Sequence, residues 1–366
     1  MKVAFLANGP GEVWGWCRPL IIEAVHRGWD VHVHLLPCPY ASGRELEALS
    51  RLPATVYRHG SSYDALRAFS KQEDCDAVLQ LGGDLLFGRW LAWRRKCPLI
   101  CYAYGRKNGM ERCDKVLTSR AGLFQCDNLE VVGDLVLDSL DAGVPHEWSA
   151  PAGKRVAVFP GSRPNIRHRV YPLLKSIQAA LGKMDPSVEL RVLLSPFADD
   201  GEADRWRQGG FSVWEGTTPA GINGANLALT QPGTNTLELM YCRQPFMVTI
   251  PYSFLRQMPL SGLVGMIGSI PSLGPALREK IIRNRLPRYI GKTAWPNRLA
   301  GEPFVPELIG EYTGEDIAEA LVKALADRES LSRQKSRLEE LASQVLPGAP
   351  TRICNILERV TAAHER

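Results

Sequence analysis

Short apolar segments alternate with helical segments along nearly the whole chain, and no other feature of the sequence limits the fold as strongly. In the first half the apolar segments are KVAFLA, VHVHLLP, TVYRHG, DAVLQLGGD, PLICYAYG, KVLTSR and LEVVGD, punctuated by Gly and Asp. Short apolar strands separated by helices are typical of a parallel sheet with helices on both faces. We therefore predict an α/β fold.

The alternation pauses once and then resumes, which predicts two domains. Pro, Gly and Ala cluster in SLDAGVPHEWSAPAGKR, and RVAVFPGSR, VELRVLLSP, FSVWEG, LALTQPGT and FMVTIP follow. A chain of 366 residues is also larger than one hydrophobic core usually organises. We assign residues 1–150 and 151–345 to two doubly wound, Rossmann-like domains, with 346–366 as a helix that can cross back. The domains are expected to face a cleft at the carboxyl ends of their strands.

Cysteine and charge exclude several classes of protein. The nine cysteines are odd in number and contain no Cys-x-x-Cys, which disfavours a disulfide scaffold or a zinc site and indicates reduced cytoplasmic thiols. A net charge of +5 is too low for a nucleic-acid partner. The uncharged segment 257–277 contains several prolines and glycines, which disfavour a membrane-spanning helix. The opening MKVAFLANGPGE is predicted as a strand and turn rather than a signal peptide.

The first apolar segment ends in a glycine-rich turn, NGPGE, that runs from Asn8 to Glu12. Such a turn lets the backbone approach a ligand closely, so Asn8, Gly9 and Gly11 are predicted to line a substrate site. The alternative is an ordinary tight turn. A dinucleotide fingerprint is disfavoured, since the third glycine falls at Gly15 and VHVHLLP ends without an acidic residue.

A second turn follows the first strand of the second half. It contains Gly161, Ser162 and Arg163, which place small residues and a guanidinium at the carboxyl edge of the sheet. Arg can pair there with a diphosphate. The alternative is an Arg that caps a local turn.

A third turn follows the strand LALT and opens a helix. Gly233, Thr234, Asn235 and Thr236 can offer hydroxyl, amide and backbone N–H groups to phosphate oxygens. Glu238 lies one turn further on. Its carboxylate can accept both hydroxyls of a ribose, or it merely complements the helix dipole.

The order of these motifs resembles a known family. The sequence PGSR at 160–163 is followed by GTNTLE at 233–238, WPNRLAG at 295–301 and VPEL at 305–308. Together they resemble lipid-A-disaccharide synthase, an inverting glycosyltransferase of the GT-B fold, from about residue 155 to 310. The resemblance implies that the second domain binds a UDP-sugar. Arg163 and the turn from Gly233 to Thr236 would receive the diphosphate, Glu238 the ribose, and Asn297 would lie near the same cleft.

The first half departs from this family. LGGD at 81–84 stands where the family has Gly-Ile-Asp-x-Pro, and VGD at 132–134 where it has Ile-Gly-His. The family's opening Ala-Gly-Glu-x-Ser-Gly-Asp is replaced by ANGPGEVW at 7–14, and LLFG at 85–88 follows Asp84. The half that binds the donor is therefore similar, whereas the half that binds the acceptor differs.

Displacement of UDP with inversion needs a base and a fixed positive potential at the departing diphosphate. Asp84 ends the apolar strand DAVLQLGGD and is the candidate base; its alternative role is to cap the following helix. Glu12 is the second candidate. A helix N-terminus and an Arg can hold the diphosphate without a metal, so we predict a metal-independent reaction and no cofactor.

Histidines and basic residues offer other sites that we consider weaker. His32 and His34 alternate on a strand and are predicted to share one face of the sheet, where a metal would need a third ligand. Arg163, Arg167 and His168 form a basic cluster, which we predict to face a phosphate or the solvent.

Positive charge is concentrated in an insert at residues 251–296, which has seven basic residues and one acidic residue, a net charge of +6. Apolar residues recur at helical spacing just before them. This combination predicts docking on an anionic membrane. The alternative is a helix packed on the other domain or on the second subunit of a homodimer. The residues predicted to contact the membrane are Leu260, Leu263, Val264, Ile267, Arg278, Lys280, Arg283, Arg285 and Arg288.

These observations predict a peripheral enzyme on the cytoplasmic face of the plasma (inner) membrane. It would move a hexosaminyl unit from a donor related to UDP-N-acetylglucosamine, acylated or not, to a lipid-linked acceptor. Two alternatives remain. One is a UDP-N-acetylglucosamine 2-epimerase on the same fold, and the other is a non-catalytic protein that binds a nucleotide sugar or a lipid.

Overall fold

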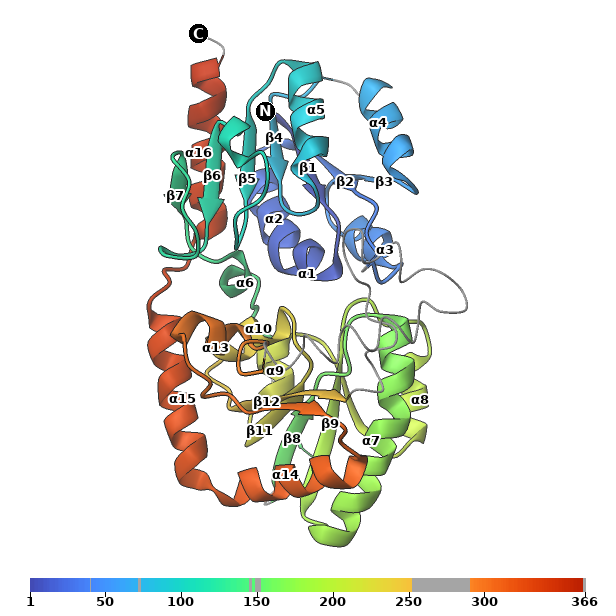
Figure 1. Ribbon diagram of the computed structural model, residues 1–366. Helices are drawn as coiled ribbons and strands as arrows, with labels where there is room; N and C mark the ends of the chain where they lie inside the picture. The colour runs from blue at the N-terminus through green and yellow to red at the C-terminus, as the bar shows by residue number, and fades with distance from the viewer. Residues whose placement is uncertain (40, 72–73, 145–146, 149–152, 252–289, 365–366) are drawn as a thin grey trace. The chain divides into compact units, whose positions relative to one another are not determined.

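The structure is a computed structural model that describes residues 1–39, 41–71, 74–144, 147–148, 153–251 and 290–364. The chain divides into two compact units (Figure 1): Met1–Ser139 together with Gln344–Arg366, and Leu140–Ser343. Each unit contains one parallel sheet with helices packed on it. The predicted fold class, two doubly wound α/β domains, is therefore confirmed.

In the part of the chain that the structure describes, the first sheet has seven strands in the order β3-β2-β1-β4-β5-β6-β7. The strands are β1 (Lys2–Ala7), β2 (Asp30–Leu35), β3 (Thr55–Arg58), β4 (Ala77–Gln80), β5 (Leu99–Tyr102), β6 (Lys115–Thr118) and β7 (Leu129–Val131). β1 is an inner strand and pairs with β2 on one side and β4 on the other. The strand order reverses between β1 and β4, the place where doubly wound folds bind ligands.

The helices of this unit include one π-helical segment directly after the first glycine-rich turn. They are α1 (Pro10–Glu12), the π-helix η1 (Val13–Cys17), α2 (Arg18–His26), α3 (Glu45–Ser50), α4 (Ser62–Lys71), α5 (Leu85–Arg95), the 3-10 helix η2 (Met110–Arg112), α6 (Leu135–Asp138) and α16 (Ala349–His364). Short π-helical segments are frequent at functional sites.

The C-terminal helix α16 belongs to the first unit and packs against α2 and α6 (Figure 1). Its start is fixed by Asp138, whose carboxylate accepts the N–H groups of Gly348 and Ala349, both at 2.7 Å. Arg352 on α16 donates to the carbonyl of Val132 at 2.8 Å. The last residues of the sequence therefore complete the core of its first part.

Within the described residues, the second sheet has six strands in the order β10-β9-β8-β11-β12-β13, all parallel. They are β8 (Lys154–Val158), β9 (Val188–Leu194), β10 (Ser212–Glu215), β11 (Leu227–Thr230), β12 (Phe246–Pro251) and β13 (Glu307–Gly310). The helices are α7 (Pro164–Met184), α8 (Glu202–Gln208), α9 (Thr218–Ile222), α10 (Asn235–Tyr241), α13 (Trp295–Ala300), α14 (Gly314–Ala326) and α15 (Arg328–Ser343). Here the order reverses between β8 and β11.

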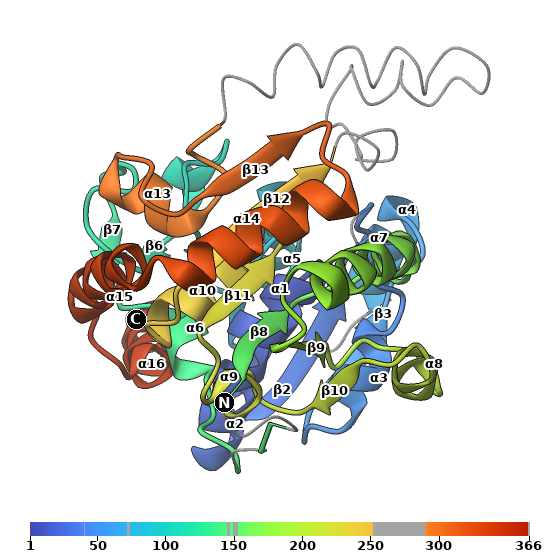
Figure 2. The same ribbon diagram turned by 90° about the horizontal axis from the view of Figure 1, so that it is seen from below.

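Helices α7 and α14 lie side by side against this sheet (Figure 2). Their apolar residues recur every three or four positions, as expected for helices with one buried face. Leu174, Ile177 and Leu181 of α7 are packed in one core with Ile317 and Leu321 of α14 and with Val156 and Val192 of the sheet. Among the described residues, no helix is long and apolar enough to cross a membrane.

The segment before β8 is anchored to the second unit through Trp148. Its indole N–H donates to the carbonyl of Asn223 at 2.7 Å, and the Arg191 guanidinium lies 3.9 Å from the ring centroid. Arg191 is fully buried and donates to the carbonyls of Gly221 and Glu147. A desolvated cation over an indole is a favourable contact, so this pair holds the segment on the sheet.

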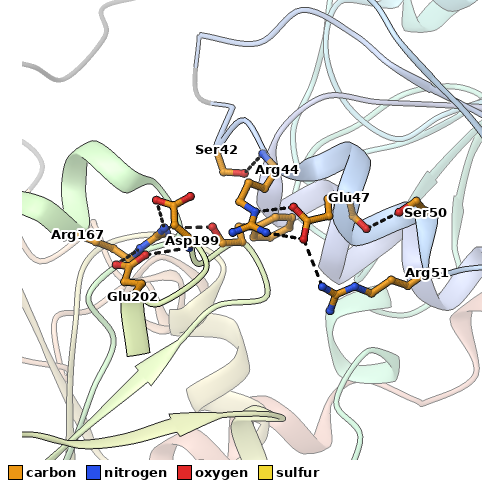
Figure 3. Close-up of polar contacts among 9 residues, drawn as sticks. Ser42, Arg44, Glu47, Ser50, Arg51, Arg167, Asp199 and Glu202 are labelled. Atoms are coloured by element: carbon orange, nitrogen blue, oxygen red, sulfur yellow. Dashed lines mark hydrogen bonds and ion pairs between the residues drawn. The ribbon is translucent and has the colours of Figure 1, made fainter. Parts of the chain in front are cut away.

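Arg167 is buried in an ion pair, which corrects our prediction that it faces a phosphate or the solvent. Figure 3 shows Arg167 beside Glu202. The Arg167 Nε donates to Glu202 Oε1 at 2.7 Å, and the Arg167 side chain is 1% exposed. Burial raises the pKa of Glu202, but the hydrogen bond and charge of Arg167 outweigh it, so this pKa lies below its ordinary value. By contrast, Arg44, which precedes α3, donates to the exposed Glu47 of that helix in a pair also drawn in Figure 3.

Glu202→Gln is expected to destabilise the second unit by about 3–5 kcal/mol, because it removes the buried counter-charge of the Arg167 guanidinium. The remaining partner, Asp199, is half exposed and lies 4.0 Å away. Urea unfolding measures this cost. Glu215→Gln is the matched control, since Glu215 pairs with Arg207 where both side chains are about half exposed, and it should cost under about 1 kcal/mol. Equal costs for the two variants would contradict this interpretation.

Candidate functional site

The carboxyl ends of β1 and β4 meet at the reversal point of the first sheet, where two glycine-rich turns surround the Glu12 side chain. A Cβ atom on Gly9 would lie 2.4 Å from Glu12 Oε2, and one on Gly82 would lie 3.2 Å from Glu12 Cγ. Asn8 Oδ1 accepts the N–H of Gly9 at 3.0 Å and would lie 2.6 Å from a Cβ on Gly82. In its present position the Glu12 side chain therefore leaves no room for a Cβ atom at either glycine. Gly11 lies beside it, half-buried within α1.

Gly82→Ala is expected to push the Asn8 and Glu12 side chains aside, because its Cβ would lie under 3.3 Å from atoms of both. A displacement of this size at a reacting group can lower a rate by about 10²-fold. Turnover of a UDP-sugar, the donor that the sequence predicts, measures the effect. Gly105→Ala is the control, since a Cβ there meets no atom within 4 Å, and it should leave turnover unchanged. Normal turnover of Gly82→Ala would show that the space around Glu12 does not matter.

Asp84 directly follows these turns and caps α5. Its Oδ1 accepts the N–H of Leu86 at 2.9 Å, so the capping role that the sequence left open is confirmed. The carboxylate is exposed, and its second oxygen accepts no hydrogen bond from any residue that the structure describes. One oxygen therefore fixes the side chain, while the other can accept a proton from a ligand.

Three polar side chains near this edge were not predicted from the sequence, because their contacts join segments that are distant along the chain. Lys107, in the segment after β5, donates to the carbonyl of Gly83 at 3.0 Å. Trp16 of η1 donates to the hydroxyl of Tyr104 at 3.3 Å, and that hydroxyl donates to Asp134. Lys107 thus holds the turn that precedes Asp84. Trp16, which follows the turn of Glu12, is held by Tyr104.

His32 and His34 lie on one face of the first sheet, as predicted, and pack in a buried group. His34 Nδ1 lies 3.0 Å from His59 Nε2, and the His34 ring stacks on Tyr57 at 4.9 Å. Burial, with smaller contributions from the charges of His59 and His32, lowers the pKa of His34 to about 3. Among the described residues, no group of three or more His, Cys, Asp or Glu side chains is placed to hold a metal ion.

The first unit is expected to lose stability as the pH falls from about 6.5 toward 3. A histidine whose pKa is lowered by folding binds its proton only in the unfolded state over this range. Each such group contributes a slope of up to about 1.4 kcal/mol per pH unit. His34→Phe should flatten the slope measured by urea unfolding at several pH values, whereas the exposed control His26→Phe should not. A slope unchanged in His34→Phe would contradict this cause.

The two predicted turns of the second unit are neighbours at its reversal point. The Phe159 N–H donates to the Leu229 carbonyl at 2.9 Å, so β8 and β11 end side by side. A Cβ on Gly161 would lie 3.8 Å from Gln231 Oε1, so the Gln231 side chain, which follows β11, lies close to the turn that follows β8. Gly161 has a φ of 98°, a conformation that favours glycine. Ser162 and Arg163, which follow it, are half-buried at the start of α7.

In the turn after β11, the first residue is exposed and the last residue is buried. Gly233 is exposed, and a Cβ on it would meet no atom within 4 Å, while Thr234 and Asn235 are half-buried. Thr236 is fully buried. Its hydroxyl donates to the Gly233 carbonyl at 2.8 Å and accepts the N–H of Trp295 at 3.2 Å. Thr236 therefore shapes the turn, which corrects our prediction that its hydroxyl reaches a phosphate.

Asn297 is 1% exposed, and its amide is fully used within the protein. Its Oδ1 accepts the N–H groups of Phe304 and Val305, and its Nδ2 donates to the Val305 carbonyl and to Glu307. The Glu307 carboxylate also accepts three backbone N–H groups within residues 291–294. The structure thus corrects our prediction for Asn297: it holds a loop beside α10 and has no group left for a ligand.

Glu238 lies in the first turn of α10 and is half-buried. Its Oε2 accepts the hydroxyl of Thr218 at 2.6 Å. Thr218 begins α9, so the contact joins two elements at this edge of the sheet. The carboxylate is therefore oriented by a defined partner and does not merely complement the helix dipole.

Two sequence features fall outside this site. One is the predicted membrane contact, which lies outside the residues that the structure describes. Its residues are Leu260, Leu263, Val264, Ile267, Arg278, Lys280, Arg283, Arg285 and Arg288.

The other is the one Asp-x-Asp sequence of the chain, at residues 74–76. It directly precedes β4, and Asp76 accepts the Lys2 N–H at 2.7 Å, so it lies at the amino edge of the first sheet, away from both turns.

Comparisons with known proteins were made on the sequence and on the structure. No protein-family model matches the chain. Two solved structures share the GT-B fold over nearly the whole length of both chains. The calicheamicin glycosyltransferase CalG4 matches at a TM-score of 0.59, with 13% identity over 99% of this chain and 98% of that one. The MnaA–UDP complex from S. aureus matches at 0.59, with 14% identity over 98% and 96%.

The sequence itself matches four curated relatives, all lipid-A-disaccharide synthases. The relative from Anaeromyxobacter dehalogenans strain 2CP-1 is 26% identical over 204 residues, which are 54% of this chain and 47% of that protein. The chain spans about half the length of the curated relatives it matches. These four matches support the interpretation that the chain is a divergent member of the lipid-A-disaccharide synthase family.

Proposed function

We propose that the chain is a glycosyltransferase that moves a hexosaminyl unit from a UDP-sugar to a lipid-linked acceptor. The observation that carries the proposal is the pair of adjacent turns after β8 and β11. They lie at the carboxyl edge of a doubly wound sheet, at the point where its strand order reverses, and this is where such folds bind nucleotides. The names of the curated relatives support the lipid-linked acceptor.

In this proposal the second unit binds the donor. Gly161, Ser162 and Arg163 and the turn Gly233, Thr234 and Asn235 receive the diphosphate, since a guanidinium and backbone N–H groups suit its oxygens. Glu238 accepts hydrogen bonds from the ribose hydroxyls. Thr236 holds the second of these turns in place, and Asn297 holds the loop beside α10; neither touches the donor.

The first unit binds the acceptor through the turn that contains Asn8, Gly9 and Gly11. The acceptor hydroxyl attacks the anomeric carbon, and Asp84 takes its proton through the carboxylate oxygen that does not cap α5. Glu12 is the alternative base. The bond from the anomeric carbon to the UDP oxygen breaks in the same displacement, so the configuration inverts, and Arg163 stabilises the departing diphosphate.

We further propose that the basic, apolar segment within residues 251–296 docks the enzyme on the anionic cytoplasmic face of the inner membrane. Its net charge of +6 supports this, since each cation near such a surface contributes about 1 kcal/mol.

A thermal-shift panel tests the donor class. UDP and UDP-N-acetylglucosamine, with or without acyl groups, are expected to raise the melting temperature, because ligands that bind only the folded state stabilise it. ADP and GDP serve as controls and should not raise it. If no uridine nucleotide stabilises the protein, the proposed function is wrong.

A further inference from the structure

Thr218 donates a hydrogen bond to the carboxylate that we assign to the ribose. Its hydroxyl lies 2.6 Å from Glu238 Oε2, and both side chains are half-buried. The two residues are 20 positions apart in the sequence and lie on α9 and α10, so the folded sheet brings them together. A hydroxyl bonded to one carboxylate oxygen restricts rotation of the whole carboxylate plane, because hydrogen bonds to a charged group are strong.

The loop that carries Thr218 is itself held firmly. Trp214, on the adjoining strand β10, donates through its indole N–H to the carbonyl of Thr217 at 2.8 Å. The indole also lies against Gly216 and Gly221, where a Cβ would stand 2.6 Å and 2.3 Å from ring atoms. Because neither glycine has room for a side chain, the indole packs directly on the loop backbone. The backbone that carries Thr218 is therefore held in place by Trp214, and the Thr218 hydroxyl stays within reach of Glu238.

The neighbouring threonine offers an internal contrast. The hydroxyl of Thr217 donates to the carbonyl of Ala142 at 3.4 Å and takes no part in the contact with Glu238. The two adjacent residues have the same side chain and are both half-buried. They differ in whether the hydroxyl reaches the carboxylate, so they form a matched pair for substitution.

We propose that the Thr218–Glu238 pair makes the site selective for a ribonucleoside diphosphate over its 2′-deoxy counterpart. This inference rests on the proposed function. A carboxylate held in one orientation can accept two neighbouring hydroxyls of a ribose, and it loses one of these bonds with a 2′-deoxyribose. A carboxylate that has lost the Thr218 hydrogen bond is held less firmly, so it adapts more easily to the single remaining hydroxyl and discriminates less. Thr218 is therefore a positioning residue that acts through Glu238.

Isothermal titration of the full chain with UDP and with 2′-deoxy-UDP tests this selectivity. The wild-type chain is expected to bind 2′-deoxy-UDP about 10- to 100-fold more weakly, the size of effect typical of one lost hydrogen bond to a charged group. Thr218→Val should lower this ratio to about threefold or less, and Thr218→Ser should restore it. Thr217→Val is the matched control and should keep the wild-type ratio.

Each contrary outcome points to a different error. If the wild-type chain binds UDP and 2′-deoxy-UDP equally, the inference is overturned while the proposed function stands. If the ratio is unchanged in Thr218→Val, Thr218 has only a structural role and the inference is also overturned. If neither nucleotide binds, the proposed function fails and the inference fails with it. Should Thr218→Val not fold, Glu238→Gln applies the same test, since its ratio should fall as well.

Discussion

Asp84→Asn is expected to lower the rate of sugar transfer by about 10²- to 10⁴-fold, the usual contribution of a general base. The substitution is chosen because of the local structure. Asp84 caps α5 through one carboxylate oxygen, and Asn is as good a helix cap as Asp. The variant therefore removes the proton acceptor while keeping the fold of the turn. Release of UDP in the presence of acceptor, followed with time, measures the rate.

Two further variants separate catalysis from capping at this position. Asp84→Ala removes the cap as well and should cost about 1 kcal/mol of stability, whereas Asp84→Asn should cost almost none. Glu12→Gln, which keeps the side chain between Gly9 and Gly82, should lower the rate much less than Asp84→Asn. If Asp84→Asn is fully active and Glu12→Gln is not, the roles of the two carboxylates are reversed.

Arg163→Ala is expected to lower kcat/KM for the UDP-sugar by about 10²- to 10³-fold. The loss of one fixed group that stabilises developing negative charge usually has this effect. Arg163→Lys should recover only part of it, because an ammonium cannot bind two diphosphate oxygens in the planar way of a guanidinium. Steady-state kinetics at varied donor concentration measure the change.

Arg205→Gln is the matched control for this prediction. Arg205 is exposed on α8 and lies in the same unit. Its loss removes one positive charge from the surface without touching either turn, so kcat/KM should change less than about twofold. Equal losses in both variants would mean that overall charge, rather than the Arg163 turn, attracts the donor.

The fold was predictable because it depends on patterns that are strong in the sequence. Strands such as VAFLA in β1 are buried throughout, and each ends at a glycine-rich or polar turn. The pause near residue 140 marked the change of sheet. By contrast, the return of α16 to the first unit depends on contacts with Asp138 and α2 that are distant in sequence, so its place could only be suggested.

The candidate site was predictable only at the level of turns. Residue type alone could not tell a side chain that faces a ligand from one that completes the fold. Thr236 and Asn297 have the right chemistry for a donor, yet their partners Trp295, Phe304 and Val305 use their polar atoms. Thr218 could not be found, because its contact with Glu238 arises only when the assembled sheet brings α9 and α10 together.

Hydrogen–deuterium exchange with and without UDP tests the central claim most directly, because it reports both binding and its place. We expect slower exchange at residues 160–165 and 232–238, the turns after β8 and β11, at saturating UDP. UDP alone should leave the turn at residues 8–12 unchanged. If protection is absent from both turns of the second unit, or is confined to the first unit, the donor site is not where the account places it.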